Sequence, residues 1–302
     1  MSDNEYEPLN QVGSDSNEVF ELDGVKLGTG CAVPTEEVMS LVKSTYAMFP
    51  QNRIYTPDQI KKRLEGDRYL KLREKRRKRM INQKTTGKCN TSALKGAVHQ
   101  VRESQGMPFV EMSDDWAYLQ INGGRDNGSL LEDAARLSAK GMAPRLVQVG
   151  GMTVEFPELV YNKSQVRREV LTAANDASRD YTTHELFIAP DNWEDFVMVI
   201  ATAIACDFPV IHAWHVGNNG MRLNNGYVNN SQGPGNHANF FHSGKWVGGK
   251  TLVHPDNQNS WGTNWGEGGF GLFTMESAFQ CRKHHTFYVL TSCNVDPGSE
   301  LR

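Results

Sequence analysis

The sequence lacks the features that mark several common classes of protein. Its first residues, MSDNEYEPLN, carry neither the basic start nor the apolar run of a secretory signal, so we expect no export by the general route. The longest apolar-leaning segment, 196–211, is interrupted by Asp207 and Pro209 and is shorter than the ~20 residues that a membrane helix needs. A formal net charge of −3 favours no polyanionic partner. We therefore expect neither a membrane nor a nucleic acid as a partner.

Cysteine is scarce and widely spaced. The five cysteines form no CxxC pair, which argues against zinc or thioredoxin-type chemistry, and their odd number predicts at least one free thiol. His212 and His215, three apart on a predicted strand, would point to opposite faces. We therefore expect no metal and no other cofactor.

What is present fits an ordinary globular protein. With 302 residues, 38% of them hydrophobic, the chain can bury a sizeable core in one or two domains. Residues 1–55 are predicted to form a polar extension, and 56–80 a basic helical segment. Helical patterns come first and strand patterns later, which predicts an α+β fold with two lobes.

A helix is predicted to begin after Thr56, where TPDQ combines a capping box with proline at the first helical position. We expect it to continue into the basic run LREKRRKRM at 72–80. Our first interpretation of that run is a solvated helical face. A protease-sensitive linker and an electrostatic docking strip are the alternatives.

The rest of the chain alternates between helical and strand patterns. Leu94, Ala97, Val98 and Val101 would share one face of a helix that follows Cys89. Further helices are predicted at 129–141, with Ser129 as cap, and at 192–205. The Asn- and Gly-rich stretch 217–235 is predicted to be a loop. Strands are predicted at 209–216, 237–242, 245–254, 270–276 and 285–292.

Cys89 lies where a cysteine becomes reactive. The unpaired amides and the dipole at a helix start favour negative charge, so a thiol there ionises more readily. A buried inert thiol is the commoner fate of a cysteine. A lone cysteine with distant His237 and Asn259, however, is the arrangement of a candidate thiol enzyme.

Several motifs in order resemble the papain-like cysteine peptidases. These are QKTTGKC at 83–89, NGS at 127–129, PVIHAWHV at 209–216 as the first strand of the second lobe, His237-Ala238, and NSWGTNWGEGGFG at 259–271, which is close to that family's asparagine motif. The resemblance runs from about residue 80 to the C-terminus. It implies a two-lobe peptidase domain over 81–302, with a helical lobe at about 85–190, a strand-rich lobe at about 191–302, and the active site in the cleft between them.

The resemblance also implies a role for each matching residue. Cys89 would be the nucleophile, and His237 its base, holding the thiolate as an ion pair. Asn259 would accept a hydrogen bond from the imidazole and fix its tautomer. An oxyanion forms when the thiolate attacks a peptide carbonyl. The side-chain amide of Gln83 and the backbone N–H of Cys89 would donate hydrogen bonds to it. Trp261 would shield the bond between His237 and Asn259 from water.

The same resemblance points to a substrate-binding cleft. Its main pocket would bind the side chain of the second substrate residue before the scissile bond, and we expect that side chain to be apolar. Trp265 would close the cleft floor or pack the strands. The substrate-binding candidates are Asn127, Gly128, Ser129, Leu130, Leu131, Ala213, Ala238, Trp261 and Trp265.

The departures from the family pattern concern a disulfide and the cleft. Thr86 and Asp126 stand where the family has a disulfide pair, which suggests a reducing compartment. Asn90 replaces the tryptophan that commonly follows the nucleophile, and Ser129 replaces a glycine. Because of these two replacements, the resemblance does not define the detailed shape of the cleft.

We therefore expect a cytoplasmic, thiol-dependent endopeptidase that acts on a protein or peptide. Three alternatives remain. A catalytically idle scaffold, such as a component of a virus particle, would keep the fold without turnover. An amidase or transpeptidase acting on cell-wall peptide would use the same residues, and an exopeptidase would need a chain end to block the cleft.

Overall fold

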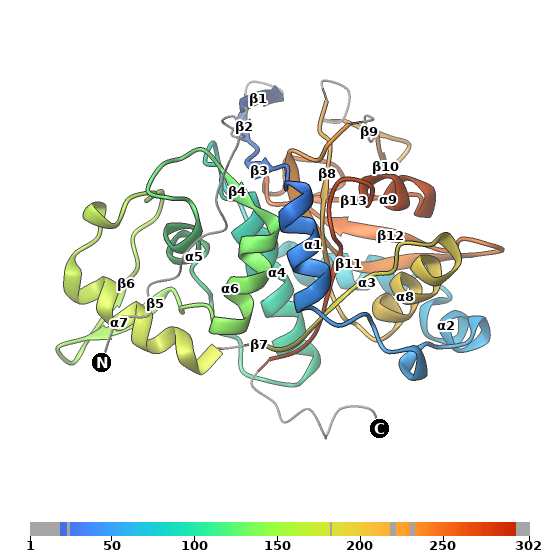
Figure 1. Ribbon diagram of the computed structural model, residues 1–302, viewed down its shortest axis with the longest axis horizontal. Coiled ribbons are helices and arrows are strands. Elements are labelled where there is room, and N and C mark those ends of the chain that lie inside the picture. Colours follow the sequence, from blue (N-terminus) through green and yellow to red (C-terminus); the bar gives the residue numbers. More distant parts are fainter. Residues whose placement is uncertain (1–18, 23–24, 182, 218–221, 230–232, 294–302) are drawn as a thin grey trace.

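The computed structural model describes residues 19–22, 25–181, 183–217, 222–229 and 233–293. One side of the molecule is mainly helical, and the other holds a large sheet with further helices packed on it, as Figure 1 shows. The predicted α+β architecture is therefore confirmed. The first 18 residues, part of the acidic stretch predicted to be a tail, lie outside the described residues.

The helical side is built around one long helix. This helix, α4 (Cys89–Ser104), packs against α5 (Asp114–Ile121) and α6 (Leu131–Lys140). Beyond them, α7 (Arg168–Ser178) lies against the hairpin of β5 (Leu146–Val149) and β6 (Met152–Glu155). Short 3₁₀ turns complete this side at Lys163–Gln165 and Arg179–Tyr181.

The sheet has eight strands in the order β7-β14-β8-β11-β12-β13-β10-β9. Their bounds are β7 Thr183–Ile188, β8 Val210–Trp214, β9 Leu223–Asn224, β10 Tyr227–Val228, β11 His237–Gly248, β12 Leu252–Gln258, β13 Phe270–Leu272 and β14 Tyr288–Cys293. Most neighbours are antiparallel, and among the described strands of this sheet only β10 and β13 pair in parallel. Helices α8 (Trp193–Ala205) and α9 (Met275–Cys281) pack on the sheet.

The N-terminal part of the chain crosses between the two sides. It forms β1 (Val19–Leu22), β2 (Val25–Gly28), β3 (Cys31–Ala32), α1 (Glu36–Thr45) and a 3₁₀ turn at Gln51–Arg53. In Figure 1 this blue segment runs down the middle of the molecule, with β3 beside β4 (Ser129–Leu130).

Most of the predicted elements are confirmed, and the differences are local. The helix predicted over 129–141 begins only at Leu131, because Ser129 and Leu130 extend to pair with β3. The loop predicted at 217–235 contains β9 and β10. The elements that were not predicted include α5, α7, the strands β5, β6 and β7, and α9, which replaces the end of a predicted strand. The expected polar extension over 1–55 is wrong in its described part, because α1 and β1 to β3 form there and the side chains of Val38 and Val42 are buried.

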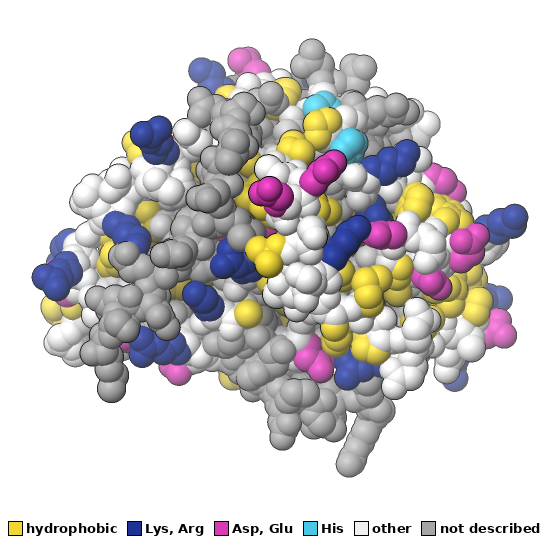
Figure 2. All heavy atoms as spheres, viewed as in Figure 1, with side chains coloured by type: hydrophobic (Ala, Val, Ile, Leu, Met, Phe, Trp, Pro, Cys, Tyr) yellow, Lys and Arg dark blue, Asp and Glu magenta, His cyan; other side chains and the backbone are white. Residues whose placement is uncertain are grey.

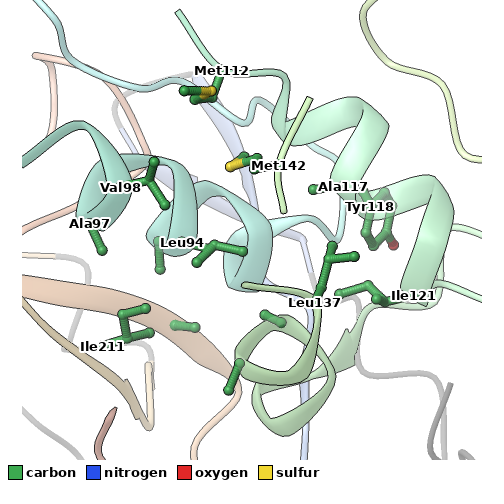
Figure 3. Packing of buried hydrophobic residues seen from close by; sticks show 14 of the residues in the cluster. Leu94, Ala97, Val98, Met112, Ala117, Tyr118, Ile121, Leu137, Met142 and Ile211 are labelled. Atoms are coloured by element: carbon green, nitrogen blue, oxygen red, sulfur yellow. The ribbon is translucent and has the colours of Figure 1, made fainter. Parts of the chain in front are cut away.

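The long helix α4 is the centre of the core on the helical side. Leu94, Ala97, Val98 and Val101 are all at most 1% exposed, as the helical spacing predicts. Figure 3 shows side chains of α5 and α6 closing on one side of this helix and Ile211 of the sheet on another. The start of α4 is thereby fixed between the helices and the sheet.

The basic run after the capping box does not form one continuous helix. The first helix, α2 (Pro57–Leu64), has the predicted capping box and ends at Leu64, and α3 (Arg68–Arg77) follows. Arg73 is 3% exposed and pairs with Asp256 on β12 at 2.7 Å and with Glu267. The run is therefore not wholly solvated, because Arg73 and Arg76 are buried while most of its other charged side chains are exposed. The linker and the docking strip stay predictions.

The surface is mixed in charge. On the right half of the face in Figure 2, basic and acidic side chains alternate, in keeping with the small net charge. Among the described helices, none is long and apolar enough to cross a membrane.

Candidate active site

Cys89 is the first residue of α4 and is fully buried. The helix packs on β11, whose second residue, Ala238, presents its backbone N–H to the sulfur, as do Asn90 and Gly30. Burial raises the pKa of the Cys89 thiol to about 12, although these amides lower it. In this arrangement the thiol is neutral at pH 7.

His237 begins β11 and is oriented by two neighbours. Its Nε2 lies 2.8 Å from Oδ1 of Asn259, so with Nε2 protonated the imidazole donates to that oxygen. The indole of Trp261 stacks on the imidazole, with 4.1 Å between ring centroids and 17° between planes. The other ring nitrogen, Nδ1, is buried and has no hydrogen-bond partner in the described part of the chain. The arrangement leaves Nδ1 able to take or give a proton.

Burial also lowers the pKa of His237, to about 4, although the bond to Asn259 raises it. The structure therefore favours a neutral imidazole of His237 and a neutral thiol of Cys89. The thiolate–imidazolium pair expected from the sequence would need water, or another polar group, to enter the site.

Gln83 lies in the loop before α4, and its side-chain amide is fully engaged. Nε2 donates to the carbonyl oxygens of Gly28 at 3.1 Å and Thr86 at 2.8 Å, while Oε1 accepts from the hydroxyl of Ser260. The indole N–H of Trp261 donates to the same Gly28 oxygen at 2.8 Å. Two donors, one from the loop before α4 and one from the chain after β12, thus converge on one peptide carbonyl.

The chain's own N-terminal segment, residues 27–32, lies beside Cys89, between β4 and the start of β11, where the resemblance places the substrate-binding cleft. Backbone bonds hold it on both sides: Gly30 and Cys31 donate to the carbonyl of Asn236 at 3.1 and 3.0 Å, and Ser129 donates to the carbonyl of Gly30 at 2.8 Å. A Cβ at Gly30 would lie 2.2 Å from the Gly87 carbonyl oxygen. The segment therefore passes this point only because residue 30 is glycine.

Asp126, which replaces one cysteine of the family's disulfide, holds the loop before Cys89 by hydrogen bonds. One of its oxygens accepts from the Gly87 N–H at 2.8 Å and from the Tyr118 hydroxyl at 2.9 Å. Thr86, at the other position, donates to the Gln83 carbonyl at 2.7 Å. Cys31, Cys89, Cys206 and Cys281 are free thiols, so the predicted free thiol is confirmed within the described residues.

Asn90 and Ser129, the two other residues that depart from the family pattern, contact each other. The Asn90 amide donates to the backbone oxygen of Ser129 at 2.7 Å and to its hydroxyl at 2.9 Å. This pair joins the start of α4 to β4. Asn90, which replaces a tryptophan, and Ser129, which replaces a glycine, are therefore coupled by direct hydrogen bonds.

The other substrate-binding candidates lie in different surroundings. Ala213 and Ala238 are direct partners on β8 and β11 and are buried. Leu130 and Leu131 are buried at the junction of β4 and α6, next to Asn127 and Gly128. Trp265 is fully buried in the core, edge-on to Trp261, and so packs the strands rather than facing the cleft.

Several contacts at the site could not be foreseen from the sequence. The Gly28–Cys31 stretch has no pattern that ties it to Cys89, since only the folded backbone brings it there. Lys88, just before Cys89, is 4% exposed and pairs with Asp115 at 2.7 Å. A groove of about 900 Å³ between β5 and α7 is lined by none of the candidate catalytic residues. No cluster of metal-binding side chains occurs in the described part of the chain.

Comparison with known proteins supports the fold. No family model and no curated protein matches the sequence. Among solved structures, procathepsin B S9 from Trypanosoma congolense matches with a TM-score of 0.59 and 14% identity over 87% of this chain and 86% of that chain. Xylellain, a cysteine protease from Xylella fastidiosa, matches with a TM-score of 0.53 and 16% identity over 87% and 91% of the two chains. The chain therefore has the papain-like fold.

Proposed function

We propose that this protein is a cysteine-type peptidase in which Cys89, His237, Asn259 and Gln83 carry the reaction. The observation that supports this most directly is the Gly28 carbonyl, which accepts hydrogen bonds from Gln83 and Trp261. These donors bind a peptide carbonyl next to a cysteine at a helix start. A substrate peptide offers the same group to the same donors.

In the proposed reaction, the N-terminal segment 27–32 first leaves the cleft. Water then reaches Cys89 and His237, and the proton moves from sulfur to Nδ1, because solvation favours both charged forms. The thiolate attacks the scissile carbonyl carbon, and Gln83 with the Cys89 N–H stabilises the oxyanion. The C–N bond breaks as the imidazolium protonates the leaving amine.

The second half of the reaction restores the enzyme. His237 takes a proton from water, and the resulting hydroxide attacks the thioester formed at Cys89. The C–S bond breaks, the carboxylic acid leaves, and the thiol is reformed. Asn259 holds the imidazole in one orientation through both steps, and the stacked Trp261 keeps water from their hydrogen bond.

A catalytically idle scaffold is the second candidate, and one observation favours it. The cleft is filled, and burial keeps both Cys89 and His237 neutral. An idle protein would keep the segment in place under all conditions. The free thiols fit a reducing compartment, such as the cytoplasm, for either candidate.

Labelling with a peptidyl chloromethyl ketone, followed by peptide mapping, separates the two candidates. A peptidase should be alkylated selectively at Cys89, and an excess of substrate peptide should slow the labelling. Cys206, which is also free, is the internal control for general thiol reactivity. Modification of Cys206 with none at Cys89 would support the scaffold.

A further inference from the structure

A small cavity lies at the C-terminal end of α4, away from the candidate active site. It has a volume of about 120 Å³. The part of α4 that borders it begins roughly 15 Å along the helix axis from Cys89. Its wall is formed by Arg79, His99, Arg102, Glu103, Met107, Phe109 and Val110. None of these residues has a role in the proposed reaction, so the chemistry of this cavity is a separate question.

Arg102, in the wall of this cavity, is a buried cation without a carboxylate partner among the described residues. Its residue is 7% exposed. Within the described part of the chain, its guanidinium makes one hydrogen bond, from Nη2 to the carbonyl oxygen of Pro108 at 3.3 Å, and Nε has no partner. The guanidinium lies over the ring of Tyr181, 4.9 Å from its centroid. A buried charge without a counter-ion is costly, and a bound anion would offset that cost.

The carboxylate in the wall, that of Glu103, already has three cationic partners. It lies 2.6 Å from Lys75, 3.6 Å from Arg76 and 3.8 Å from Arg79, all from the basic run. Burial lowers the pKa of Arg76 to about 10, so its guanidinium stays charged at pH 7. With Arg102, four cations therefore surround one carboxylate. Other carboxylates nearby pair with cations outside the wall, and these pairs are Asp207–Arg68, Asp256–Arg73 and Glu111–Lys95.

His99 adds a neutral donor to the same wall. Its Nε2 accepts a hydrogen bond from the backbone N–H of Met112 at 3.1 Å, so the neutral ring carries its proton on Nδ1. Burial lowers the pKa of His99 to about 3, which keeps the ring neutral at pH 7. The wall therefore combines the N–H of a neutral imidazole with the guanidinium groups of Arg79 and Arg102.

We propose that this cavity is a binding site for a phosphate group, held by Arg102 and Arg79 with His99 as a further donor. Guanidinium groups bind phosphate through paired N–H···O bonds, and a phosphate dianion matches the local excess of positive charge. The volume of about 120 Å³ is several times what one water molecule needs. Because Arg79 and Phe109 are partly exposed, free phosphate and the phosphate of a phosphomonoester could both enter. The site does not depend on the proposed peptidase function.

The test is isothermal titration calorimetry of the full-length protein with inorganic phosphate. Potassium chloride would hold the ionic strength constant, which separates a specific site from general screening of surface charge. We expect saturable binding. Arg102→Gln and, in a separate protein, Arg79→Gln should each raise Kd about tenfold or more, because each removes a charge-assisted hydrogen bond. Glu103→Gln should lower Kd roughly fivefold or more, because it removes the negative charge from the wall.

Arg77→Gln is the matched control, because Arg77 belongs to the same basic run but is exposed and lies outside the wall. It should change Kd by less than about twofold. Thermal melts would verify that each variant is folded, and the more exposed Arg79 serves as the test if Arg102→Gln does not fold.

A parallel titration with phenyl phosphate separates the two sources of the phosphate group. Binding as tight as that of inorganic phosphate would identify a phosphomonoester as the ligand, and weaker binding would identify free phosphate. The site would be overturned by the absence of saturable binding of either compound, by an equal loss in Arg77→Gln, by an unchanged Kd in the folded arginine variants, or by weaker binding in Glu103→Gln.

Discussion

Gln83 combines two roles that a substitution can separate. Its amide is aimed at a peptide carbonyl, and it also ties the loop before α4 to Ser260 and Thr86. In an active enzyme, the first role stabilises charge that appears only after attack. The second role fixes the loop in the resting molecule.

Gln83→Ala should therefore lower kcat by roughly 10²–10³, which corresponds to ~3–4 kcal/mol of transition-state stabilisation, and change KM much less. Gln83→Glu should be slower still, because a carboxylate repels the oxyanion. Steady-state kinetics with a fluorogenic peptide, run beside thermal melts, measure both roles. A stable Gln83→Ala protein with unchanged kcat would remove the residue from the mechanism.

At the scale of elements, the N-terminal segment 27–32 competes with substrate for the cleft. A methyl group at Gly30 would collide with the backbone of Gly87 and not with a side chain that could rotate away. The segment should then seat poorly. We expect Gly30→Ala to increase the rate of Cys89 alkylation roughly tenfold or more, measured by intact mass against time.

Val33→Ala is the matched control for Gly30→Ala. Val33 directly follows the segment 27–32 and is 49% exposed, so its truncation should leave the rate of Cys89 alkylation unchanged. Slower labelling of Gly30→Ala than of the unaltered chain would show that the segment does not shield Cys89.

Helix α3 is held to the sheet by a buried ion pair. Arg73→Ala would leave the carboxylate of Asp256, which is fully buried, without its main cationic partner. His242 also contacts that carboxylate, at 2.9 Å. Removal of one partner of a buried pair costs about 3–5 kcal/mol, so the free energy of unfolding should fall by that amount. Lys71→Ala, at an exposed position of the same helix, should change it by less than about 0.5 kcal/mol, and chemical denaturation compares the two.

Local patterns predicted the elements whose signals are local. The capping box at Thr56 and the apolar face of α4 are properties of consecutive residues, and both are found in the structure. Ser129 illustrates the limit. Its residue type suits a helix cap, but pairing with Cys31, almost a hundred residues away, draws it into a strand.

The residues of the candidate site that lie in sequence motifs were predicted, but the contacts made by distant parts of the chain were not. The motifs identified Cys89, His237, Asn259 and Gln83, and the structure brings the last three into contact with Trp261, Ser260 or Gly28. The segment over the cleft was not predicted. Its glycines look like those of any loop until the folded backbone brings Gly30 against Gly87.

At the scale of the whole molecule, buried histidines govern stability in acid. Burial lowers the pKa of five of them below the usual 6.5; these are His99 and His212 to about 3, His237 and His285 to about 4, and His242. The unfolded chain binds these protons below about pH 6.5, and the folded chain does not. Stability should therefore fall as the pH drops from about 6.5 to 4.

Glu132, which is buried in the first turn of α6, should act in the opposite direction. Its folded pKa of about 8 lies above the ordinary value for a glutamate, so the folded chain keeps a proton that the unfolded chain has lost. Its contribution therefore weakens stability as the pH rises from about 4.5 to 8. We expect the free energy of unfolding, measured by denaturant titration, to peak near pH 6–7, and Glu132→Gln to flatten the alkaline side. Rising stability from pH 6.5 to pH 4.5 would contradict this account.

The central claim is that Cys89 cleaves peptide bonds once the cleft is open. The most direct measurement is the release of product from an internally quenched peptide library by the full-length Gly30→Ala protein under reducing conditions. It would be compared with the same protein carrying Cys89→Ala. We predict hydrolysis by the first protein and none above background by the second, with equal thermal stability. Equal rates in the two proteins, or no hydrolysis by Gly30→Ala protein whose Cys89 is shown by alkylation to be accessible, would contradict the claim.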